Sequence, residues 1–145
     1  MSATSILRQM YACENRIDKL NNKISQLEDD IDELNNLNNR LNSLQEDFVK
    51  EYNSRRNDIE TIGTFTDDVK LAKTYYDGMN GLINGSSYYT ANNSIVNSQI
   101  NVNNKIRQLN AELEEKKNSL GYEYSRLYEL ECIYDEAVAE ESTNY

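Results

Sequence analysis

The sequence contains no proline, histidine or tryptophan, and only five glycines among 145 residues. Because proline and glycine supply most tight turns, their scarcity argues against a many-stranded β fold. Histidine is the commonest general base near neutral pH and the commonest metal ligand, so its absence removes the usual machinery of hydrolases and zinc enzymes. These absences favour a non-enzymatic, all-helical chain that binds or scaffolds other molecules.

Basic residues are also scarce, with 15 Lys and Arg against 25 Asp and Glu and a formal net charge of -10. A nucleic-acid partner is not expected, because phosphate binding needs clustered Lys and Arg. No run approaches the roughly 18 apolar residues of a membrane span. The first residues lack the charged start and apolar run of a signal peptide. We therefore expect a cytoplasmic protein whose export, if it occurs, needs another route.

Apolar residues recur at spacings of three and four in the first part of the chain, which is the pattern of a coiled-coil helix. The a positions hold Met10, Ile17, Ile24 and Ile31, and the d positions hold Cys13, Leu20, Leu27 and Leu34. The stripe weakens beyond Phe48 and Gly63 is a suitable helix stop. The pattern predicts a long helix over residues 5–61.

The heptad pattern changes at Asn38, which occupies the next a position, where an apolar residue is expected. Apolar residues resume as Leu37, Leu41, Leu44 and Phe48. This spacing predicts a phase jump of three residues in the stripe. Asn38 either faces the other helix, where a buried Asn can fix the pairing register, or rotates outward, and the pattern leaves both open.

Residues 63–91 differ in composition, since they hold four of the five glycines and two Tyr-Tyr pairs. Thr64 or Thr66, followed by Asp67-Asp68, resembles a helix cap with acidic residues in the first turn, and predicts a short helix over 67–77. The glycines from Gly78 to Gly85 are expected to break it. We expect these residues to connect two long helices.

The helical period returns in a second long helix predicted over 92–141, with 142–145 as a tail. Each long helix has one apolar stripe and needs a partner to bury it. With a flexible connector, the simplest closure is an antiparallel hairpin. The predicted fold is therefore all-α: one domain over 1–145, with two long helices in an antiparallel coiled-coil hairpin and a short helix in the connector.

The second helix carries more apolar and aromatic surface than a two-helix hairpin buries. Tyr122, Tyr124, Tyr128 and Leu130 lie partly off its stripe and are expected to stay exposed. Such a surplus predicts an interface with a partner protein or a second copy, although isolated exposed tyrosines are also common. The predicted partner-binding residues are Tyr122, Tyr124, Leu127, Tyr128, Leu130, Glu131 and Tyr134.

No cofactor or metal site is expected. The acidic runs sit on helix faces opposite the stripe, and helical di-iron sites use Glu-x-x-His motifs that a histidine-free chain cannot supply. Cys13 and Cys132 lie at comparable heights if the hairpin is antiparallel. Cys13 occupies a d position, where a reduced thiol acts as a small hydrophobe, and we favour that interpretation over a disulfide.

The long Ile/Leu heptads, the Tyr/Gly-rich connector with Tyr88-Tyr89, the acidic end and the length of 145 residues resemble the YwqH-like family of small helical proteins. Members are typically encoded beside LXG-domain toxins of Gram-positive type VII (Esx-type) secretion systems and look like relatives of Trp-x-Gly secreted hairpins. The resemblance implies a targeting partner or chaperone. It would bind the helical N-terminal LXG region of a toxin, with or without a second small helical protein, and accompany it to the secretion machinery.

The chain departs from that family at two motifs. It lacks the Trp-x-Gly turn, for which Tyr76 and Gly78 in Tyr76-Asp77-Gly78 are the nearest equivalent. It also lacks the Tyr-x-x-x-Asp/Glu export signal, whose closest version is Leu127-x-x-x-Glu131. Whether the chain carries an export signal or completes one with its partner stays open. The alternative is a self-assembling coiled-coil structural or adaptor protein, with the heptads forming a homodimer.

Overall fold

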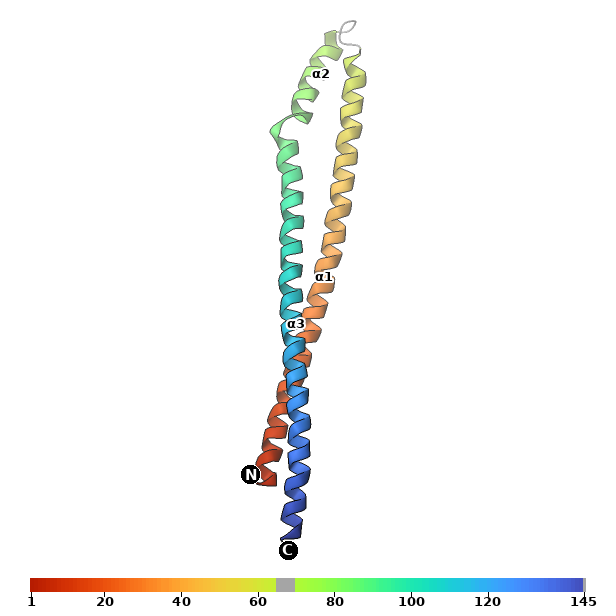
Figure 1. Cartoon of the computed structure of the whole chain (residues 1–145). Coiled ribbons are helices and arrows are strands. Elements are labelled where there is room, and N and C mark those ends of the chain that lie inside the picture. The colour runs from red at the N-terminus through yellow and green to blue at the C-terminus, as the bar shows by residue number, and fades with distance from the viewer. Residues whose placement is uncertain (65–69, 145) are drawn as a thin grey trace. The chain divides into compact units, whose positions relative to one another are not determined.

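The computed structural model describes residues 1–64 and 70–144 as an all-helical chain. It contains α1 (Ala3–Gly63), α2 (Lys70–Ile83) and α3 (Ser86–Thr143), as Figure 1 shows. No strand occurs in these two ranges, so the all-α prediction is confirmed for them. The predicted cap at Thr66 and Asp67-Asp68, with the first residues of the predicted short helix, lies outside the described residues.

The chain divides into two compact units. Unit 1 contains Met1–Glu33 and Ile106–Tyr145, and unit 2 contains Leu34–Lys105. Each unit therefore pairs one part of α1 with one part of α3, and unit 2 also includes α2.

The core of unit 1 forms where the a and d positions of α1 meet the apolar stripe of α3. Ile6, Cys13, Ile17 and Leu130 are buried against one another. The partly buried residues around them are Met10, Leu120, Leu127, Tyr134 and Ala137. This arrangement follows from the three-and-four spacing, which is uninterrupted in α1 and mostly apolar in α3 and keeps one stripe of each helix facing the other.

Polar contacts show that the two segments of unit 1 are antiparallel. The Ala3 backbone N–H donates to Glu141 Oε1 over 3.1 Å. Farther along α1, Lys23 Nζ lies 3.6 Å from Glu112 Oε1. The contacting residues of α3 have falling numbers as the residue numbers of α1 rise, so the start of α1 and the end of α3 lie at the same end of this unit (Figure 1).

Unit 2 corrects the predicted phase jump. Leu37 and Leu44 are 40% and 52% exposed, whereas Leu41 is half-buried. The partly buried residues that continue the original a and d register are Asn38, Leu41, Gln45, Phe48 and Tyr52. The prediction was wrong because it followed apolar residues alone, while the heptad here continues through amide side chains.

Hydrogen bonds explain why amides are accommodated at these positions. Asn38 Nδ2 donates to Asn103 Oδ1 over 3.2 Å. Gln99 Nε2 on α3 donates over 2.9 Å to both Asn42 Oδ1 and Gln45 Oε1. Asn38 therefore faces α3, as one of the two open alternatives had it, because a partly buried amide is tolerated when it is hydrogen-bonded.

An aromatic cluster marks the start of α3. The ring of Tyr88 stacks on Tyr52 with centroids 3.7 Å apart and on Phe48 with centroids 5.4 Å apart. This packing orders a segment that was predicted to be connector, and α3 accordingly begins at Ser86 rather than residue 92. The sequence did not predict this start of the helix, because the composition around Tyr88-Tyr89 is turn-like and a single Tyr-Tyr pair shows no helical period.

Helix α2 also runs farther than expected. It passes through Gly78 and Gly81 to Ile83, so Tyr76 and Gly78 lie in a helix and form no turn. No glycine in the described ranges has a positive φ. The break comes at Gly85, where an added Cβ would lie 2.9 Å from the Gly81 carbonyl oxygen. Only a residue without a side chain fits that close approach.

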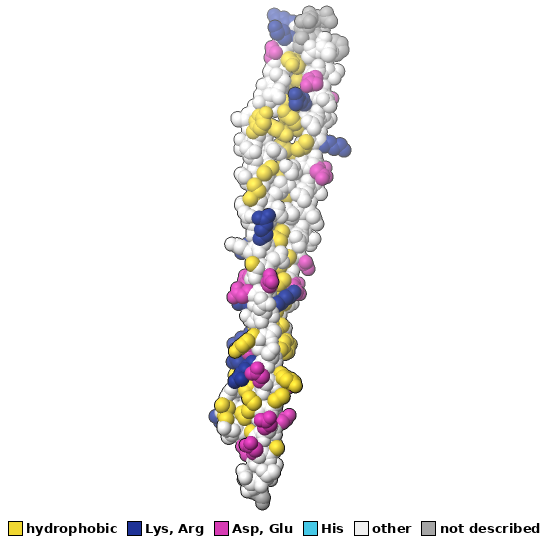
Figure 2. Space-filling model, in the orientation of Figure 1, with side chains coloured by type: hydrophobic (Ala, Val, Ile, Leu, Met, Phe, Trp, Pro, Cys, Tyr) yellow, Lys and Arg dark blue, Asp and Glu magenta, His cyan; other side chains and the backbone are white. Residues whose placement is uncertain are grey.

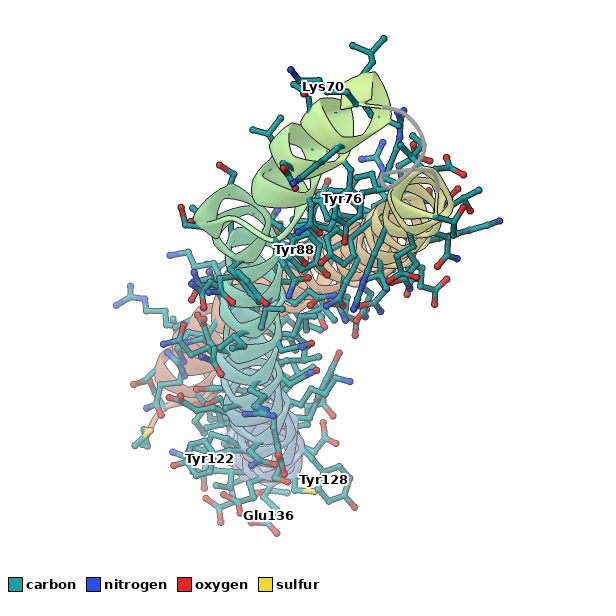
Figure 3. The ribbon with its side chains drawn as sticks, turned by 90° about the horizontal axis from the view of Figure 1, so that it is seen from above. Lys70, Tyr76, Tyr88, Tyr122, Tyr128 and Glu136 are labelled. Carbon is teal, nitrogen blue, oxygen red and sulfur yellow. The ribbon has the colours of Figure 1, made fainter. Side chains whose placement is uncertain are left out.

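The far end of α1 is packed against α2 through a second close approach. A Cβ at Gly63 would lie 2.7 Å from Cε2 of Tyr76, so the missing side chain leaves room for the tyrosine ring. Figure 3 shows Tyr76 lying beside this end of α1. Gly63 at the end of α1 and Gly85 after α2 thus both act by allowing a close approach rather than by adopting unusual backbone angles.

Candidate protein-binding surface

The predicted partner-binding residues divide into an inward set and an outward set. Leu127 and Tyr134 pack against the Cys13 cluster of unit 1, and Leu130 is only 3% exposed. The prediction that Leu130 stays exposed is wrong. It continues the three-and-four spacing Leu120, Glu123, Leu127, Leu130, Tyr134, which becomes visible only when Glu123 is accepted as a seam residue.

The outward set contains Tyr122, Tyr124, Tyr128 and Glu131. The three tyrosines are 69%, 50% and 68% exposed, respectively. Figure 3 shows Tyr122 and Tyr128 projecting from opposite sides of α3. The structure therefore does not bring all the predicted residues to one surface.

Two ion pairs identify the two flanks of unit 1. Glu28 Oε1 lies 3.6 Å from Lys117 Nζ on one flank, and Lys23 pairs with Glu112 on the other. In an antiparallel helix pair, residues seven apart lie on one flank and residues four apart are neighbours. These two rules assign each remaining exposed residue of unit 1 to one of the two flanks.

The first flank, which we call the tyrosine flank, runs from the Glu28 to Lys117 ion pair toward the start of α1 and the end of α3. It consists of Leu7, Tyr11, Glu14 and Asp18 of α1 and of Tyr124, Tyr128, Glu131, Asp135 and Val138 of α3. Its three tyrosines are at least half exposed, and Val138 is 42% exposed. Figure 2 shows exposed hydrophobic side chains among carboxylates near the terminal end of unit 1.

The second flank, which we call the Lys23 flank, has mixed charge. It includes Arg16, Lys19, Lys23, Glu112, Tyr122, Arg126, Glu129, Ile133, Glu136 and Glu140. An open hollow on it is lined by Tyr122, Ser125, Arg126 and Glu129. Arg126 Nη1 lies 3.3 Å from Glu129 Oε2, so the charges bordering this hollow largely neutralise each other.

A polar group sits within the core between the two flanks. The Cys13 thiol donates to the Glu123 backbone oxygen and to Glu123 Oε2, each over 3.1 Å. Glu123 Oε1 accepts from Arg16 Nε over 3.0 Å. The Arg16 and Cys13 hydrogen bonds hold the pKa of the Glu123 carboxyl below its ordinary value.

The same contacts disfavour the thiolate form of Cys13. Burial, followed by the nearby Glu123 carboxylate, raises the pKa of the Cys13 thiol above its ordinary value. Nucleophilic cysteines need the opposite shift, because the thiolate is the reactive form. Cys132 is exposed and, like Cys13, is a free cysteine. The contacts of this group therefore join α1 to α3 within unit 1.

A further exposed apolar surface, on α2, was missed by sequence reasoning. Leu71, Tyr75 and Leu82 are 76%, 51% and 69% exposed. An open apolar hollow is lined by Ile62, Leu71, Ala72 and Tyr75. The spacing of these residues could have identified it, but the glycines nearby made a continuous helix unexpected.

The described residues hold no cluster of three or more Cys, Asp or Glu side chains arranged to bind a metal ion. Likewise, none of the three helices, as far as they are described, has a stretch long and apolar enough to cross a membrane. The exposed rings and carboxylates of unit 1 offer aromatic packing and carboxylate pairing, both of which suit protein recognition.

Comparison with known proteins adds no assignment: no protein-family model, curated protein or solved structure gives a significant match to the chain.

Proposed function

We propose that the chain is a non-enzymatic helical partner protein. In this proposal α1 and α3 form an antiparallel coiled-coil hairpin with α2 in its connector. The hairpin binds the helical N-terminal LXG region of a type VII (Esx-type) secreted toxin in the cytoplasm, as a targeting factor or chaperone, and promotes its export. The family resemblance supplies the identity of the partner.

The observation that carries the proposal is the exposure of Tyr124 and Tyr128 on unit 1. Both rings are at least half exposed, although the segment from which they project is otherwise packed against α1. Tyrosine is enriched in the centres of protein interfaces because it buries a large area at low entropic cost. An exposed pair at i, i+4 spacing suits a helix packing alongside α3.

A self-assembling coiled coil is the second candidate, favoured by Ile at a and Leu at d in α1, which is the pattern of parallel dimers. Against it, Ile6, Cys13 and Ile17 already pack against Leu130 of the same chain. Multi-angle light scattering and the distance between labels near the two chain ends separate the candidates. A parallel dimer of extended chains places the labels far apart, and a hairpin brings them together.

The direct test is co-expression with the product of the neighbouring gene, which the family resemblance predicts to be an LXG toxin, followed by pull-down. The expected result is a soluble complex that Tyr128→Asp weakens at least about tenfold. Tyr89→Asp is the matched control, because Tyr89 is a similarly exposed tyrosine near the start of α3. A monomer that ignores the toxin, or equal effects of the two substitutions, would overturn the proposal.

A further inference from the structure

The tyrosine flank of unit 1 differs from the Lys23 flank in charge. Beyond the Glu28 to Lys117 ion pair, its charged residues are Glu14, Asp18, Glu131 and Asp135. Neither Lys nor Arg occurs among the residues that define this flank. The nearby Arg8 belongs to the outermost ridge of α1, away from the seam. The flank thus combines aromatic rings with carboxylates alone.

These carboxylates are available to a partner. Glu14, Asp18, Glu131 and Asp135 are all exposed. By contrast, two acidic residues of the Lys23 flank are held in ion pairs, Glu112 with Lys23 and Glu129 with Arg126. The negative charge of the tyrosine flank is therefore the less compensated of the two.

Each helix contributes both rings and carboxylates to this flank. On α3, Tyr124 and Tyr128 are followed by Glu131 and Asp135, and on α1, Tyr11 is followed by Glu14. A helix laid along this flank would meet tyrosine rings with its apolar stripe and carboxylates with its bordering positions. Lys or Arg at those positions would pair with the carboxylates and could also lie over the ring faces.

We infer that the tyrosine flank is a docking site for a basic amphipathic helix, which adds to unit 1 as a third helix. The inference rests on the proposed function in one respect only, that a protein partner binds unit 1, and it names the chemistry of that partner. Charge complementarity favours this partner over others. An acidic or neutral helix would leave the four carboxylates of the flank facing apolar or like-charged groups.

The test uses the full chain and two synthetic helical peptides of about 20 residues, long enough to span about 30 Å. Both carry the same Leu and Ala stripe, and they differ only in having Lys and Arg or Glu at the bordering positions. Calorimetric titration at low and high salt should show that the basic peptide binds and that high salt lowers its affinity. Binding of the acidic peptide with equal affinity overturns the inference.

Two double variants locate the site. Glu131→Lys with Asp135→Lys reverses the tyrosine flank, and Glu136→Lys with Glu140→Lys makes the same change in net charge on the Lys23 flank. The first double variant should lower the affinity for the basic peptide at least about tenfold and the second less than about threefold. The reason is that exposed charges act over roughly 10 Å. Equal losses would show that only net charge matters and would overturn the inference.

The outcomes also separate the inference from the proposed function. If the toxin binds but the Glu131 and Asp135 double variant binds it normally, the docking site is refuted while the function survives. If the toxin never binds, yet the basic peptide binds through this flank, the docking site survives and the function is refuted. Circular dichroism of each variant verifies that the helices are intact, so that lost binding reports the surface.

Discussion

The Cys13 thiol of α1 donates to the Glu123 carboxylate of α3, with Sγ 3.1 Å from Oε2. Glu123 occupies a position where the seam of α3 would ordinarily hold an apolar residue, and its side chain is only 14% exposed. A carboxylate at such a place is tolerated because the thiol and the Arg16 guanidinium satisfy it. The pair thus fixes which residue of α3 faces Cys13.

Glu123→Gln should lower the free energy of unfolding by about 1 kcal/mol, because it loses a charge-assisted hydrogen bond to a half-exposed Arg16. Urea unfolding followed by circular dichroism measures the change. Glu129→Gln is the matched control, since its ion pair with Arg126 lies on the surface. Equal effects of the two substitutions would mean that Glu123 has no special role in unit 1.

The same group predicts a dependence of stability on pH. The pKa of Glu123 is lowered in the fold, so its contribution is present above the ordinary carboxyl value of 4.5 and is lost as the pH falls through the folded value. The pKa of Cys13 is raised, so its contribution is present below 9.0 and is lost as the pH rises through the folded value.

Urea midpoints measured across this range should therefore form a plateau with an acid and an alkaline limb. Because other carboxylates also titrate in acid, the informative quantity is the difference between the wild type and Glu123→Gln. That difference should shrink as the pH falls below 4.5. A difference independent of pH would contradict the assigned ionisation.

The two thiols should differ in reactivity. Cys132 is exposed and Cys13 is buried with a raised pKa, so a thiol reagent at neutral pH should modify Cys132 rapidly and Cys13 only on unfolding. Mass spectrometry of the labelled protein distinguishes the sites. Protein purified without reductant that shows no reactive thiol would instead indicate a disulfide.

Asn38→Ile should stabilise unit 2 by about 1 kcal/mol, because it places an a-type residue in a seam where the Asn38 Oδ1 is buried without a hydrogen-bond partner. Thermal and urea unfolding measure the gain. The same change at the exposed neighbour Asn39 should alter stability by less than about 0.5 kcal/mol. Destabilisation at residue 38 would show that its bond to Asn103 matters more than burial.

The register of unit 2 can be tested with two leucines of the same helix. Leu41→Ala should cost about 1 to 2 kcal/mol and Leu44→Ala less than about 1 kcal/mol, because Leu41 is partly buried and Leu44 is 52% exposed. Equal costs would favour a phase-shifted stripe over the continuous heptad.

How far the sequence predicts this structure depends on the chemistry of the seam. Where the seam of α1 is apolar, as from Met10 to Leu34, the spacing identified the inward face and the helix correctly. Where polar residues occupy the inward face, it was mistaken at Gln45 in α1 and at Glu123 in α3 and was left open at Asn38. Hydrophobic periodicity carries no information about an amide or a carboxylate that finds its partner only in the fold.

The candidate surface shows the same limit. Tyr124 and Tyr128 could be recognised as surplus aromatic residues from their positions off the stripe. Their separation from Tyr122 required the helix pairing, since only the Lys23 and Glu28 ion pairs show which flank each residue joins. The distinction between an acidic flank and a mixed one therefore depends on geometry that composition cannot supply.

The amide contacts of unit 2 have a mechanical consequence. Gln99 already donates to acceptors on two successive turns of α1, Asn42 and Gln45. A slide of one helix past the other by a turn would break both bonds, and a seam amide left without its partner is costly. These amides should therefore hold α1 and α3 of unit 2 in one register, although the seam there has fewer apolar residues than that of unit 1.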